Sequence, residues 1–156
     1  MNRTTLASSA VLAAFLAAVA AAALSGVFFP PGAWYEALEK PALTPPNWIF
    51  APVWSALYVC IAVAGWLVWQ SGQRGLPIGL WVAQLLLNAA WSWLFFGLHL
   101  PGVAFAEIVL LWATIVSTIA VFSRIRALAA GLMLPYLAWV SLAAWLNWGL
   151  WQLNQR

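Results

Sequence analysis

The sequence predicts an all-α integral membrane protein: a bundle of five transmembrane helices with a long loop between the first and the second. Hydrophobic residues make up 66% of the 156 residues and charged residues only 6%, whereas soluble domains have about 45–50% and about 25%. The apolar residues gather in five stretches, each close to the roughly 20 residues that a helix needs to cross a bilayer. Thirteen tryptophans agree with this class, because indole is favoured at membrane interfaces.

Each predicted span is bounded by residues that cannot continue a buried helix. The loop 29–49 combines several prolines with charged side chains, and proline removes a backbone donor that lipid cannot replace. Shorter breaks rich in glycine or polar residues follow at 71–75, 97–102 and 123–126. We therefore expect one domain over residues 1–156, with spans at roughly 5–28, 50–70, 77–97, 101–123 and 127–151.

The first span has a second interpretation. Arg3, an Ala/Leu-rich run and Ala-x-Ala triplets near Ala20 also fit a cleaved signal peptide. The apolar run is longer than a usual signal core, which favours a membrane span.

The basic residues predict the orientation. Four arginines lie on the side of the N-terminus and two basic residues on the other: Arg3, Arg74, Arg124 and Arg126 against Lys40 and Arg156. The positive-inside rule places the N-terminus in the cytoplasm and the loop 29–49 outside. A helical bundle favours the inner membrane of a bacterial cell.

The charged and reactive residues exclude several function classes. The six basic residues are scattered, whereas nucleic-acid binding needs them clustered on one face. There is a single histidine, His99, and no aspartate, so we expect neither a metal site nor a Ser-His-Asp triad. The lone Cys60 cannot form an intrachain disulfide. No phosphate-binding loop is present, and we expect no required cofactor.

Polar residues inside the spans predict an interior site, because polar groups in a bilayer usually face the bundle. Gln84, Asn88 and Ser92 recur at helical spacing with Trp91 beside them, and Glu107 is the only acid within a span. The second span adds Trp54 and Tyr58, and the fifth presents Tyr136, Trp139, Ala143 and Asn147 on one face. These groups could simply bond helix to helix, or they could line a pocket for a flat, largely apolar ligand.

Two further patterns bear on packing. Gly75, Gly79 and Ala83 form a stripe of small residues, which permits close helix contact inside the bundle or between two copies, so we expect a homodimer. Among the tryptophans, we expect three to line the site, Trp54, Trp91 and Trp139. The others are expected in the loop, at span ends, or against lipid and neighbouring helices: Trp34, Trp48, Trp66, Trp69, Trp81, Trp93, Trp112, Trp145, Trp148 and Trp151.

Short motifs along nearly the whole chain resemble one known family. They are WYEALEKP at 34–41, PPNW at 45–48, APVW at 51–54, NAAW at 88–91, FFG at 95–97, LPYLAW at 134–139 and LN at 146–147. In this order they are similar to the translocator protein family, whose bacterial members are called tryptophan-rich sensory proteins, or TspO.

The resemblance implies a five-helix bundle, often dimeric, that binds porphyrins such as protoporphyrin IX and haem in a pocket capped by the first loop. It implies that the pocket residues are Tyr35, Trp54, Asn88, Trp91, Phe95, Trp139, Ala143, Leu146 and Asn147. Tyr58 joins them from its place one turn after Trp54. Trp54 and Trp139 match two tryptophans linked in some bacterial members to porphyrin breakdown by light and oxygen, which makes them the candidate catalytic residues.

Three functions follow as expectations. The first is a membrane receptor or sensor of porphyrin-type tetrapyrroles, with a possible part in their transport or regulation. The second is a light- and oxygen-dependent porphyrin-degrading enzyme, and the third is a protein that binds sterol, membrane lipid or a partner. The sterol pattern of animal members is absent, since Trp148 and Gln152 stand at the matching places, so tetrapyrrole fits better than cholesterol.

Overall fold

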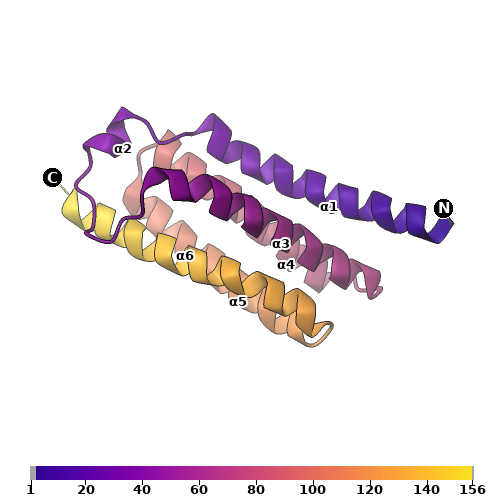
Figure 1. The fold of residues 1–156 in the computed structure, drawn as a ribbon. Helices are drawn as coiled ribbons and strands as arrows, with labels where there is room; N and C mark the ends of the chain where they lie inside the picture. The colour runs from indigo at the N-terminus through magenta and orange to yellow at the C-terminus, as the bar shows by residue number, and fades with distance from the viewer. Residues whose placement is uncertain (1–2, 156) are drawn as a thin grey trace.

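Five long helices form one bundle in a computed structural model of the chain (Figure 1), which describes residues 3–155 and the side chains of residues 8–155. They are α1 (Arg3–Phe28), α3 (Phe50–Gln70), α4 (Leu76–Ser92), α5 (Pro101–Ser123) and α6 (Ala127–Leu153). All five are long and apolar enough to cross a membrane. The predicted all-α membrane bundle is confirmed.

Two short pieces interrupt the first loop, which the sequence predicted only as a long connection. They are the helix α2 (Ala33–Ala37) and the 3₁₀ turn η1 (Asn47–Ile49), which leads directly into α3. The third span also differs from a plain helix, because its last turn, η2 (Trp93–Gly97), is π-helical. There the Leu98 amide donates to the Trp93 carbonyl oxygen at 2.9 Å. An inserted residue of this kind is often found at functional sites.

The helices pack in the ring order α1, α3, α6, α5, α4. In this order α1 contacts both α3 and α4, α3 contacts α6, and α5 lies against both α6 and α4. The centre is filled by fully buried side chains such as Ile61, Ile115 and Met133. All five long helices therefore contribute to the bundle, and α2 lies at the end of the bundle where the chain's C-terminus lies (Figure 1).

Gly65 allows α3 to lie close to the aromatic side chains of α1 and α4. Gly65 of α3 faces Trp81 of α4 and Phe15 of α1, whose rings lie 4.6 Å apart between centroids. The Trp81 indole, predicted to meet lipid or a neighbouring helix, is buried and donates from Nε1 to the Ile61 carbonyl oxygen at 2.9 Å. This contact holds α3 against α4 although the two helices touch over only a short length.

Candidate ligand pocket

One interior cavity lies among α3, α4, α5 and α6. It is lined by Trp54, Asn88, Trp91, Ile108, Leu111, Val140 and Ala143. Four of these were predicted as pocket residues from the sequence: Trp54, Asn88, Trp91 and Ala143. The cavity measures about 20 Å³, room for about one water molecule, whereas pockets for drug-sized ligands measure roughly 300–1,000 Å³. The structure therefore shows a closed site.

Tyr58, a predicted pocket residue, does not line the cavity itself but is bonded to Asn88, which does. The Tyr58 hydroxyl donates to Oδ1 of Asn88 at 3.0 Å, joining α3 to α4. The Trp54 ring lies against both Tyr58 and Tyr136, with centroid distances of 5.2 and 6.1 Å. Tyr136 of α6 is fully buried. Polar side chains from α3, α4 and α6 thus lie close to the cavity.

Trp91 is held in place by Asn147. The Trp91 indole donates from Nε1 to Oδ1 of Asn147 at 3.0 Å, and the Asn147 amide donates from Nδ2 to the Pro101 carbonyl oxygen at 2.8 Å. On its other side Trp91 stacks on Phe95, with centroids 5.1 Å apart. Asn147 and Phe95, both predicted as pocket residues, therefore contact Trp91 and do not line the cavity themselves.

Several buried polar atoms near the interior lack a partner among the described residues. They are Oε1 of Gln84, both carboxyl oxygens of Glu107 and the hydroxyl of Tyr136. Buried polar atoms are nearly always hydrogen-bonded in folded proteins, to protein or to ordered water. These atoms are therefore available to a water molecule or to a ligand group that donates a hydrogen bond.

The first loop covers one end of the bundle. Tyr35 of α2 is only 7% exposed and meets the edges of Phe95 and Phe96, with centroids 6.3 and 5.5 Å apart. Burial raises the pKa of the Tyr35 hydroxyl. The neighbouring Trp34 stacks on His99, at 4.3 Å between centroids, where His99 adopts a positive φ of 56°. Tyr35 thus covers the aromatic cluster behind Trp91, and its predicted part in a ligand pocket stays a prediction.

A pair of hydrogen bonds ties the same loop to the end of α6. The Glu39 amide donates to Oδ1 of Asn154 at 3.1 Å, and the Asn154 side chain donates from Nδ2 back to the Glu39 carbonyl oxygen at 3.0 Å. The ring of Pro41 also lies against Gly149, where an added Cβ would come within 2.6 Å of its Cγ. The loop is therefore hydrogen-bonded to the end of α6 and also packs on the α4–α5 turn, where Trp34 stacks on His99. The two hydrogen bonds to Asn154 are called the latch below.

We expect Asn154→Ala to loosen this latch. Each hydrogen bond contributes about 0.5–1.5 kcal/mol, and because both are exposed we expect about a fivefold increase in loop opening. A glutamate-specific protease should cleave at Glu39 about fivefold faster in the variant. Asn47→Ala, which replaces an exposed asparagine of the loop itself, is the control. Equal cleavage rates in the two variants would show that the Asn154 bonds do not hold the loop.

The remaining predicted residues lie elsewhere. Trp139 packs edge-on against Phe50, with centroids 5.6 Å apart, and is not in the cavity wall. Leu146 is buried without lining the cavity. The roles of Trp139 and Leu146 stay predictions. Sequence reasoning did not single out Ile108 and Val140, although Val140 lies one turn after Tyr136 on the same predicted face.

The small-residue stripe has room for a partner helix. Gly75 precedes α4 as its N-cap, with a positive φ of 61°, so only Gly79 and Ala83 belong to the helix. An added Cβ at Gly79 would meet nothing within 4 Å among the described residues. The predicted homodimer through this stripe stays a prediction.

Among the side chains that the structure describes, those of residues 8–155, no three His, Cys, Asp or Glu residues are grouped so that they could hold a metal ion.

The family is decided by comparison with known sequences. Residues 10–152 match the model of the TspO/MBR family. The chain belongs to the TspO/MBR family. Among its relatives, the protein CrtK of Rhodobacter capsulatus is 34% identical over 151 residues, covering 94% of each chain. The tryptophan-rich protein TspO of Chlorobaculum tepidum is 40% identical over 129 residues, or 80% of this chain and 82% of the relative.

The TspO/MBR match extends to animals. The translocator protein of Ovis aries is 40% identical over 127 residues, covering 78% of this chain and 75% of its own. The resemblance inferred from the short motifs is confirmed, and this TspO/MBR protein is an integral membrane protein.

Proposed function

We propose that this protein is a membrane receptor for porphyrin-type tetrapyrroles, such as protoporphyrin IX and haem, and that it senses or carries them. The observation that supports the proposal is the convergence of Trp54, Asn88, Trp91 and Ala143 on one interior cavity from three helices. Indole faces offer stacking surfaces for a flat conjugated ring.

Binding in this pocket requires an opening. A tetrapyrrole cannot enter a cavity of about 20 Å³, so the helices or the capping loop must move when it binds. The latch at Asn154 and the stack of Trp34 on His99 are the contacts that hold the loop closed.

A receptor is proposed rather than a photo-oxidative enzyme. The enzymatic hypothesis depends on two indoles beside the ligand, Trp54 and Trp139. In this structure Trp54 lines the cavity, whereas Trp139 packs against Phe50 outside its wall.

The test is a titration of the protein in lipid nanodiscs with protoporphyrin IX, followed by tryptophan fluorescence. We expect saturable quenching and an affinity lowered about three- to tenfold in Trp54→Leu, since one aromatic contact contributes about 0.5–1.5 kcal/mol beyond its buried area. Trp93→Leu removes an exposed indole from η2 and should leave the affinity unchanged. Linear, non-saturating quenching of the unaltered protein would contradict the proposal.

A further inference from the structure

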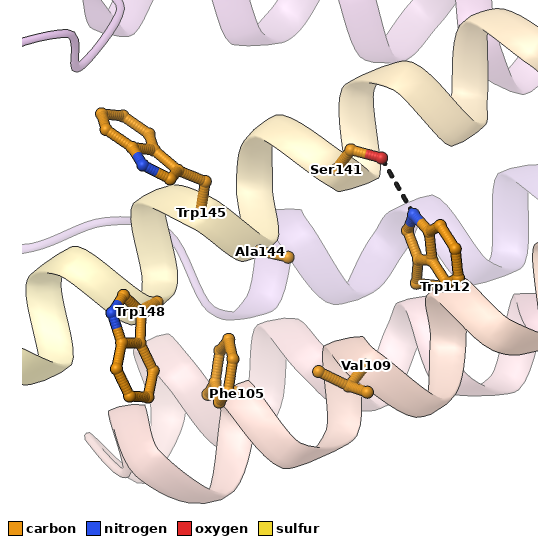
Figure 2. Close-up of a pocket in the computed structure, with 7 residues that line it drawn as sticks. All are labelled: Phe105, Val109, Trp112, Ser141, Ala144, Trp145 and Trp148. Atoms are coloured by element: carbon orange, nitrogen blue, oxygen red, sulfur yellow. Dashed lines mark hydrogen bonds between the residues drawn. The ribbon is translucent and has the colours of Figure 1, made fainter.

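A much larger hollow lies on the outer surface of the bundle, between α5 and α6 (Figure 2). Phe105, Val109 and Trp112 line it along α5, and Ala144, Trp145 and Trp148 line it along α6. Its volume is about 520 Å³, within the roughly 300–1,000 Å³ of small-molecule sites. Unlike the interior cavity, this groove is open without any movement of the helices.

The groove has an aromatic wall in which one indole is fixed by hydrogen bonds. The Trp112 indole donates from Nε1 to Oγ of Ser141 at 2.9 Å, and the Ser141 hydroxyl donates to the Leu137 carbonyl oxygen at 2.8 Å (Figure 2). The two bonds satisfy both polar side chains and fix the orientation of the indole. At the other end Phe105 lies against Trp148, with centroids 5.0 Å apart. The indole N–H groups of Trp145 and Trp148 have no partner among the described residues, so an occupant can be largely apolar and can accept hydrogen bonds at these two places.

The shape and chemistry of the walls favour a flat conjugated ring over other occupants. The three groove indoles remain 40–45% exposed, and stacking of a conjugated ring on an exposed indole contributes about 0.5–1.5 kcal/mol per aromatic pair. A lipid acyl chain is thin and flexible and gains nothing specific from fixed aromatic walls. A second copy of the chain would need a ridge that fits this hollow, and the small-residue stripe of α4, which is suited to helix contact, lies on another helix.

We propose that the α5–α6 groove is a second tetrapyrrole site, open to the lipid. This inference rests on the proposed function. A tetrapyrrole that has partitioned into the membrane can dock here while the interior pocket is closed. The groove begins at Phe105, four residues into α5 and therefore about 6 Å from its first residue at 1.5 Å per residue. The acidic substituents of the ring can thus stay near the membrane surface.

The groove and the interior cavity lie on opposite sides of the contact between α5 and α6. Val109 lines the groove while the preceding Ile108 lines the cavity, and Ala144 lines the groove while Ala143 lines the cavity. Each site can therefore be filled separately by substituting one of two adjacent alanines. These two positions form a matched pair for the experiment.

The experiment measures protoporphyrin IX stoichiometry and affinity in nanodiscs for the unaltered protein, Ala143→Trp and Ala144→Trp. We expect two bound porphyrins per chain in the unaltered protein and one in each variant. Trp148→Leu, which removes one wall without adding bulk, should weaken only the groove binding, by about three- to tenfold.

The outcomes separate this inference from the proposed function. If Ala144→Trp and Trp148→Leu both bind like the unaltered protein while Ala143→Trp loses binding, the groove site is wrong and the interior receptor stands. If the unaltered protein shows no saturable binding, the proposed function itself fails. If Ala144→Trp changes the oligomeric state and leaves porphyrin stoichiometry at the unaltered value, the groove is a protein interface and the inference is overturned.

Discussion

Gly65→Leu is expected to destabilise the bundle by about 3 kcal/mol or more, at the upper end of the cost of overpacking. A Cβ at this position would lie 2.5 Å from Nε1 of Trp81 and 2.7 Å from Cε1 of Phe15. Both rings are buried, so neither can turn out of the way without losing packing. Moving Trp81 would also break its hydrogen bond to the Ile61 carbonyl oxygen. Thermal unfolding in detergent, followed by circular dichroism, measures the loss.

The matched control for this prediction is Gly131→Leu. Gly131 is also a glycine within a spanning helix, but an added Cβ there would meet nothing within 4 Å among the described residues. We expect this variant to unfold at or slightly above the temperature of the unaltered protein, because glycine is a poor helix former, by about 1 kcal/mol relative to alanine. Equal destabilisation by the two substitutions would show that the close contacts of Gly65 with Trp81 and Phe15 do not cause the loss of stability.

Asn147→Leu is expected to weaken tetrapyrrole binding about tenfold and to reduce stability by about 1–2 kcal/mol, since bonds between membrane helices average about 0.6 kcal/mol and reach about 1.7. The substitution removes the acceptor for the Trp91 indole and the donor to the Pro101 carbonyl oxygen. The freed indole can then leave the orientation in which it lines the cavity. Fluorescence titration with protoporphyrin IX measures the affinity.

A double-mutant cycle with Trp91→Phe separates positioning from packing. If Asn147 acts by orienting the indole, Asn147→Leu should add little to the loss of affinity already caused by Trp91→Phe. Fully additive losses would mean that Asn147 acts on the ligand directly or through the bundle as a whole. Stability is measured in parallel, so that a loss of fold is not taken for a loss of binding.

The helix bounds were predictable because local residues set them. Pro101 and Pro77 stand in the first turn of α5 and α4, where the missing amide has no helical partner in any case. The predicted spans 50–70 and 101–123 coincide with α3 and α5. By contrast, the π-helical turn at Trp93–Gly97 has no signal in the sequence. It lies where Tyr35 of the loop packs against Phe95 and Phe96.

The site was predictable in part. Helical spacing predicted that Asn88 and Ala143 face inward, and both line the cavity. Helical spacing could not show which of Trp139 and Val140, neighbours on one helix turn, lines the cavity. Their places depend on how α6 is rotated against α3, where Trp139 meets Phe50. The α5–α6 groove was missed because Trp112 and Trp145 were expected simply to meet lipid or neighbouring helices.

Composition and periodicity by themselves determined that the chain is a membrane bundle of five helices, since apolar length and helix-breaking residues act locally. The same local patterns predicted which faces carry the polar groups. Only the tertiary structure decided that the interior site is closed and that the open hollow lies outside, between α5 and α6. Cavity volume is set by the relative rotation and separation of helices, which depend on contacts between residues far apart in the chain, such as Trp91 with Asn147.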